Sequence, residues 1–263
     1  MMRNRKLLDN IYLVLIFIFL FLPIFVLVVF SFNSSRLNIV FEHFTFKWYG
    51  ELFKNHVLLE SLLNTLIVAI VSTVVATFMG TISSYGLKKY DFPGKKYIKK
   101  LLYIPIIIPE IVLGISLLCI YSLFKLKLGM FSLILSHIAF SIPFVIVNVN
   151  SSLEAMHPNI EEAASDLGAN KIQTLLRVVF PCLMPGILSG AQLAFTLSLD
   201  DVVVSYFTAG PDSNTLPLQI FSMIKSGVTP DVNALITIML MMIFLGLNIS
   251  MFVSIRRMKR VGV

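Results

Sequence analysis

Three carboxylates stand in stretches of the chain that are otherwise apolar: Glu110, Asp200 and Asp201. A carboxylate within an apolar helix costs about 3 kcal/mol on insertion scales, so it usually faces a partner or a water-filled path. Asp200 and Asp201 are consecutive, and on a helix their side chains point about 100° apart. One could therefore line a path for a cation while the other pairs with a neighbouring helix. Ser198 and Ser205 share the helix face of Asp201, which favours Asp201 as the pathway residue.

Prolines precede the first of these carboxylates. Glu110 follows Pro109, and Pro105 lies one turn earlier. Each proline removes an amide donor and frees the carbonyl four residues back. We therefore expect a broken, hydrated helix face at Glu110.

The cysteine, histidine and glycine patterns do not support metal, disulfide or nucleotide chemistry. Cys119 and Cys182 lie in separate apolar stretches, with no CxxC pair and no histidine spacing suited to zinc. The sequence GxxxxGK[ST], which cradles phosphates, does not occur, and the nearest glycine pair, Gly80 and Gly86, is followed by Leu87. We expect no metal and no cofactor on this chain.

Apolar runs of about twenty residues, the length that a helix needs to cross a bilayer, recur six times. The runs are apolar nearly all round, unlike the helices of soluble domains. The chain is therefore predicted to be an all-α membrane protein with six transmembrane helices. The expected spans are residues 11–32, 62–87, 101–124, 131–149, 181–206 and 232–255.

Lysine and arginine are concentrated on one side of this topology. If the N-terminus is inside, the inside segments hold most of the 21 lysine and arginine residues. This positive-inside bias predicts cytoplasmic N- and C-termini. The formal charge of +7 is then a topological and lipid-headgroup feature, and nucleic acid is not needed to explain it.

The pieces between the spans suggest a simple organisation. We expect a helix and an external interfacial segment over residues 1–60, a five-span core over 61–255 and a basic cytoplasmic tail over 256–263. In the external segment, residues 41–55 mix aromatic rings with charges, which suits an interfacial helix at headgroup depth.

The loop over residues 151–180 is the one predicted inside loop long enough to present structure. Pro158 suits the first turn of a helix, Asn159 and Glu162 have the spacing of an N-terminal cap, and Gly168 suits a left-handed stop. These features predict a short helix over 159–167 and an amphipathic piece over 171–178, before Pro181 opens the fifth span. By composition alone, a solvated loop that only links two spans is the favoured interpretation.

A longer series in this loop changes that interpretation. It consists of Glu162, Ala163, Ala164, Gly168, Val178, Phe180 and Pro181. The series resembles the EAA motif of ABC-importer permease subunits, EAA-x3-G-x9-I-x-L-P, and departs only by Val178 for Ile and Phe180 for Leu. The resemblance implies a type I ABC-importer permease fold in which a coupling helix sits in a cleft of an ATPase subunit. The coupling residues would be Glu162, Ala163, Ala164, Gly168 and Pro181.

Other segments resemble one branch of that family, the PotC-type permease subunits of bacterial spermidine/putrescine importers. They are residues 33–36, 46–49, 136–138, 143–145 and above all 198–205. The resemblance implies polyamine uptake by alternating access across the bacterial cytoplasmic (inner) membrane. The implied partners are a second homologous permease, an ATPase dimer that carries ATP and Mg, an external polyamine-binding protein and membrane lipid.

Polyamines are flexible aliphatic cations. They need separated carboxylates for the ammonium groups and apolar or aromatic walls for the methylenes. The carboxylates would be Glu110, Asp200 and Asp201, and the candidate walls are Tyr85, Tyr121 and Tyr206. Tyr85 and Tyr121 fall near span ends, where an interfacial anchor is the simpler interpretation. His137 is interpreted as a hydrogen-bonded packing residue.

Other classes of protein remain open at this point. A related ABC permease for another small solute would share the loop and the general layout. An ion-coupled secondary transporter could use Glu110 and Asp200, but the chain lacks an evident inverted repeat. A membrane enzyme with paired carboxylates would lack a nucleophile and base set. The chain is therefore expected to be a non-catalytic subunit.

Overall fold

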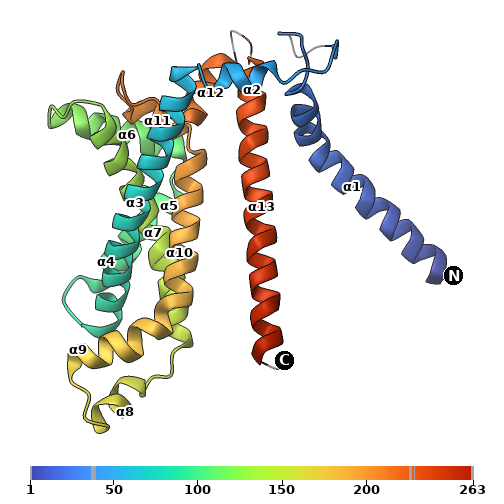
Figure 1. Ribbon diagram of the computed structural model, residues 1–263. Coiled ribbons are helices and arrows are strands. Elements are labelled where there is room, and N and C mark those ends of the chain that lie inside the picture. The colour runs from blue at the N-terminus through green and yellow to red at the C-terminus, as the bar shows by residue number, and fades with distance from the viewer. Residues whose placement is uncertain (1, 37–39, 225–226, 228, 262–263) are drawn as a thin grey trace. The chain divides into compact units, whose positions relative to one another are not determined.

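The computed structural model describes residues 2–36, 40–224, 227 and 229–261, and it forms helices and no named strand in that part of the chain. Figure 1 shows the helices in order. Their bounds are α1 Met2–Phe30, α2 Lys47–Leu52, α3 His56–Lys89, α4 Lys95–Leu102, α5 Ile104–Ile107, α6 Glu110–Leu123, α7 Met130–Ala155, α8 Ile160–Asp166, α9 Lys171–Thr174, the π-helical turn η1 Leu175–Val179, α10 Phe180–Asp200, α11 Val203–Thr208, α12 Leu216–Met223 and α13 Pro230–Val261.

Two compact units divide the chain. Unit 1 consists of Met1–Leu59 and Ser222–Val263, and unit 2 of Glu60–Phe221. The predicted boundary between residues 60 and 61 lies next to the first division. The contacts, however, group the last helix with the first, whereas the predicted core over 61–255 includes it. The predicted basic tail, 256–263, lies outside the residues whose side chains are described.

Four helices of the described residues are long and apolar enough to cross a membrane. They are Asn10–Phe30, His56–Lys89, Met130–Ala155 and Lys171–Asp200. Lys95–Ile107 and Glu110–Leu123 form a fifth if they are one span bent by 113°, and Pro230–Leu245 is a shorter apolar helix. The prediction of an all-α membrane protein is confirmed, while the number of six spans and the cytoplasmic termini stay predictions.

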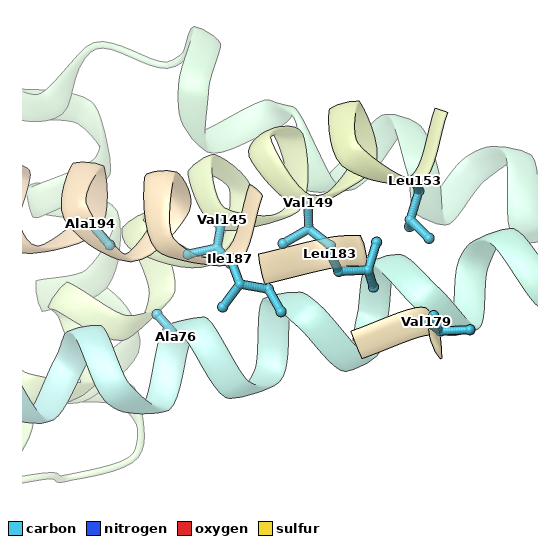
Figure 2. Close-up of a cluster of buried hydrophobic side chains, with 8 residues drawn as sticks. All are labelled: Ala76, Val145, Val149, Leu153, Val179, Leu183, Ile187 and Ala194. Atoms are coloured by element: carbon cyan, nitrogen blue, oxygen red, sulfur yellow. The ribbon is translucent and has the colours of Figure 1, made fainter. Parts of the chain in front are cut away.

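The core of unit 2 lies where α3, α7 and α10 meet. Its buried residues are Ala76, Val145, Val149, Leu153, Val179, Leu183, Ile187 and Ala194, and Figure 2 shows them converging from these helices and, at Val179, from η1. Gly186 and Gly190 lie four residues apart on the face of α10 that packs on α7. A Cβ at Gly186 would lie 2.5 Å from the carbonyl oxygen of Asn148, so only glycine permits this approach.

Unit 1 differs from the predicted interfacial helix over residues 41–55. Only Lys47–Leu52 is helical, and Trp48 is buried, with its indole Nε1 donating to the carbonyl oxygen of Asn33 at 2.6 Å. The indole therefore has its hydrogen-bond partner within the protein, while the headgroup depth of the segment stays a prediction. Phe44 and Phe46 stay exposed and pack around Phe32.

Candidate functional site

The helix that leads to Glu110 is broken, as its prolines predict. After α5, Ile108 and Pro109 have extended backbones with ψ of 133° and 136°, and Glu110 is the first residue of α6. The axes on the two sides of this break differ by 113°. The break places the Glu110 carboxylate at a helix start, where the exposed amides favour a negative charge.

A second break follows Asp200, so the prediction of a continuous helix over 181–206 is wrong. Asp200 ends α10, and Asp201 has an extended backbone with ψ of 124°. The carboxylate of Asp201 explains the break, because it caps the next helix, α11. It accepts from the amide of Val204 at 3.1 Å, and from the amide and the hydroxyl of Ser205 at 2.7 Å each.

The two breaks face one another across a cavity of about 350 Å³ within unit 2. Glu110, Asp200 and Asp201 all line it, so the structure brings together the three carboxylates that the sequence singled out. The remaining lining residues are apolar: Pro105, Ile106, Ile108, Leu113, Phe140, Phe144, Leu197, Val202, Val203 and Val204. Acidic groups on apolar walls suit a cation with an aliphatic body.

The three carboxylates are not equivalent. Glu110 and Asp200 are exposed, and in the described part of the chain neither forms an ion pair. The side chain of Asp201 is 6% exposed, and its Oδ2 lies 3.5 Å from Nε2 of His137. The sequence favours Asp201 as the pathway residue, and that assignment stays a prediction. In the structure its carboxylate is engaged within the protein, with α11 and with His137 of α7. Among the described residues, Glu110 and Asp200 line the cavity without an ion-pair partner.

His137 is fully buried in α7 beneath these groups. Its Nδ1 is 2.7 Å from the Ser198 hydroxyl, and its Nε2 is 3.1 Å from the Ser205 hydroxyl. The prediction of a hydrogen-bonded packing residue is confirmed. The residue joins the end of α10 to the start of α11, and so supports the second break.

The three candidate tyrosines lie in different places, and none lines the cavity. Tyr121 is 4% exposed and its hydroxyl lies 2.7 Å from that of Ser136, so its ring packs within unit 2 and does not reach this cavity. Tyr206 is exposed on α11, with its ring against the edge of Phe207. Tyr85 lies in the last turns of α3, and its hydroxyl is 3.3 Å from the carboxylate of Glu161 in α8; Figure 1 shows α8 at the far end of α3.

The loop over residues 151–180 contains the predicted short helix, α8. The helix ends as Gly168 predicts, with a φ of +86°. The amide of Gly168 donates to the carbonyl of Ser165, and the amide of Ala169 to that of Ala164, which is a Schellman ending. Asn159 is the N-cap residue of α8, as predicted, but its side chain makes no capping bond. The capping box lies at α9, where Asn170 and Gln173 exchange bonds of 2.9 and 3.0 Å.

The predicted coupling residues differ in their exposure to solvent. Ala164 is 8% exposed and packs inward, whereas Glu162, Ala163 and Gly168 are exposed, and Pro181 stands in the first turn of α10. Sequence reasoning missed three exposed apolar side chains of the same loop: Leu167, Ile172 and Leu176. Leu167 is 90% exposed. The sequence does hold a signal for Leu167, because it is an apolar residue in a polar loop and stands directly before the glycine that ends the helix.

A small cluster of polar side chains attaches this loop to α3. The Nζ atom of Lys89 lies 2.7 Å from Oε2 of Glu161 and 2.5 Å from the hydroxyl of Tyr85. The Tyr85 hydroxyl is also 3.3 Å from both Glu161 oxygens. Sequence reasoning missed Lys89 and Glu161, because their positions in the sequence do not show that they meet. The cluster therefore links α8 to α3.

Comparison with known proteins adds to this geometry. Residues 76–260 match the family described as binding-protein-dependent transport system inner membrane component. The chain belongs to this family. It is 44% identical over 219 residues to the spermidine/putrescine transport system permease protein PotC of Escherichia coli K12, covering 83% of each chain. It is 36% identical over 221 residues to the putrescine transport system permease protein PotI of the same strain, covering 81% of this chain and 79% of the relative.

A solved structure supports the fold of this family member. A bacterial ABC transporter involved in the import of the acidic polysaccharide alginate contains a chain that superposes with a TM-score of 0.76. The match covers 95% of this chain and 96% of that one, at 16% sequence identity. The likeness places the chain in the ABC-transporter permease fold.

Proposed function

We propose that this chain is a permease subunit of an ABC importer that moves polyamines from an external binding protein into the cytoplasm by alternating access. The observation that carries the proposal is the cavity in which Glu110 and Asp200 present exposed carboxylates among apolar walls. The names of the relatives point to the same cargo.

The cavity suits the chemistry of this cargo. An ammonium group would bind to Glu110 or Asp200, and the methylenes would lie against Phe140 and Phe144. Glu110 begins α6 just after the first break, and Asp200 ends α10 just before the second. Because the two carboxylates belong to different helices, a rocking motion of one helix against the other would change the distance between them. A site of this kind can bind a cation in one state and release it in another.

The arrangement in the membrane is also part of the proposal. The chain would cross the bacterial inner membrane six times with both termini in the cytoplasm. The α8 helix would contact an ATPase dimer, which binds ATP and Mg, and the cavity would open towards a second homologous permease. In this arrangement the exposed face of Glu162, Ala163 and Leu167 is free to enter a cleft of the ATPase.

Copurification tests the proposal as a whole. Extraction of the tagged chain from membranes should yield a second permease and an ATPase, identified by mass, and their ATP hydrolysis should rise when polyamine and its binding protein are added. Recovery of the chain alone, or ATP hydrolysis that responds to other solutes and not to polyamine, would contradict it.

Single cysteines test the orientation. In a Cys119→Ala, Cys182→Ala background, Lys95→Cys and Ser165→Cys should react with an impermeant thiol reagent only from the cytoplasmic side, and Lys54→Cys only from outside. All three positions are described, and Ser165 and Lys54 are exposed. Labelling of Lys95→Cys in intact cells would overturn the orientation.

A further inference from the structure

A second cavity in unit 2 lies away from the carboxylates and has the opposite charge. It measures about 300 Å³ and lies between the end of α3, the α4 helix and the end of α7. Its lining residues are Leu87, Lys88, Lys95, Lys99, Leu102, Tyr103, Ile146, Asn150, Leu153 and Glu154. Three ammonium groups against one carboxylate make it basic, so it is unsuited to a polyamine.

The lysines of this cavity differ in how they are held. Lys95 is paired with the exposed Asp91 at 2.6 Å, and this hydrogen bond lowers the pKa of the Asp91 carboxyl. Lys88 donates to the carbonyl of Leu153, which fixes its position without neutralising its charge. In the described part of the chain, neither Lys88 nor Lys99 forms an ion pair. Two positive charges are therefore available to an anion.

The floor of the cavity is apolar. Leu87, Ile146 and Leu153 are buried beneath the ammonium groups, and Tyr103 is 42% exposed. A small inorganic anion makes no use of such a floor. A ligand with an anionic head and an apolar body contacts both parts.

The position of the cavity along the helices indicates where that ligand comes from. The candidate spans His56–Lys89 and Met130–Ala155 both end at its edge. The α4 helix beside it alternates lysines with exposed apolar residues: Tyr97 is 74% exposed, Leu101 59% and Ile98 42%. A short basic helix with exposed apolar side chains at the end of membrane spans suits the depth of lipid headgroups.

We infer that this cavity is a binding site for an anionic phospholipid. The phosphate lies between Lys88 and Lys99, and the glycerol and the first methylenes lie over Leu87, Leu102 and Ile146. Because α4 leads directly to the break at Glu110, a bound lipid holds the start of the bent pair against α7. The inference does not depend on the identity of the transported solute.

Lipid binding by the full-length protein, with its copurifying chains, tests the site. The protein is placed in nanodiscs of phosphatidylcholine, and binding of a trace of fluorescent phosphatidylglycerol is measured by energy transfer from the protein. Lys88→Gln with Lys99→Gln should weaken binding about 30-fold. The matched control is Lys96→Gln with Lys100→Gln, which removes the same charge from exposed lysines that do not line the cavity. The control should change binding less than threefold.

A second variant keeps the test decisive if loss of Lys88 disturbs α7. Glu154→Gln removes the only carboxylate that lines the cavity and leaves every lysine in place, so it should tighten binding about fivefold. If both double-lysine variants weakened lipid binding equally, the lipid would be attracted by the overall charge of the region, and the site would be overturned. Unchanged binding in Glu154→Gln, or displacement of the lipid by millimolar inorganic phosphate, would also overturn it.

Discussion

The carboxylate-lined cavity and the loop that carries α8 lie in the same unit, but they hold their acidic residues in different ways. In the loop, Glu161 is committed to Lys89 and Tyr85, which attach α8 to α3. In the cavity, Glu110 and Asp200 are exposed and unpaired among the described residues, and only Asp201 is committed to the protein. A paired carboxylate links two elements of the protein, while an unpaired one beside apolar walls is available to a cation. On the function proposed above, the loop is the mechanical end of the unit and the cavity is its binding end.

The largest effect is expected at the mechanical end. Leu167→Asp replaces an apolar side chain that is 90% exposed, so it should leave the chain folded in the membrane but abolish ATPase association and uptake. Copurification of the ATPase measures the first effect and labelled polyamine uptake the second. Tyr90→Asp is the matched control, because Tyr90 is also exposed and lies in another predicted inside segment, away from this loop. Normal copurification of the ATPase with Leu167→Asp would show that the end of α8 does not contact the ATPase.

At the binding end, Glu110→Gln and Asp200→Asn should each reduce polyamine uptake about tenfold to a hundredfold, since each removes a charged hydrogen-bond partner of the cargo. The changes are nearly isosteric, and both side chains are exposed, so assembly and basal ATP hydrolysis should be retained. Uptake per assembled complex is the measurement. Wild-type uptake in both variants would show that the cavity does not bind the cargo.

Asp201→Asn should affect stability more than transport. The amide keeps one acceptor for α11 but loses the charge next to His137, and a cost of about 1–2 kcal/mol is expected. Thermal unfolding in detergent should therefore begin at a lower temperature than in Asp200→Asn, while uptake per folded molecule changes little. If Asp201→Asn instead lowered uptake more than Asp200→Asn and left the unfolding temperature unchanged, the first interpretation, in which Asp201 is the pathway residue, would be restored.

The smallest effect is expected for the link between Lys89 and Glu161. Both side chains are about one-third exposed, so solvent screens the pair and its coupling energy should be about 0.5 kcal/mol. A double-mutant cycle with Lys89→Gln and Glu161→Gln measures it by thermal unfolding. Additive effects would mean that the pair does not hold α8 to α3.

The two regions also differ in how far the sequence predicts them. The bounds of α8, its stop at Gly168 and the break at Pro109 follow from local backbone chemistry, and the structure confirms them. The break after Asp200 was missed, because it depends on Ser205 and on His137 of another helix. The partners of Asp201 and Glu161 could not be predicted for the same reason. Gly186 and Gly190 were also not singled out; their spacing is typical of a close helix contact, but which helix they meet depends on the fold.

The most direct test of the account uses the reconstituted complex with both free carboxylates removed, Glu110→Gln together with Asp200→Asn. ATP hydrolysis is measured with the binding protein, in the absence and presence of polyamine, and uptake is measured in the same vesicles. The account predicts basal hydrolysis close to that of the unaltered complex, because the α8 contact is intact, together with loss of polyamine uptake. Full uptake by the double variant would contradict the assignment of the cavity as the binding end.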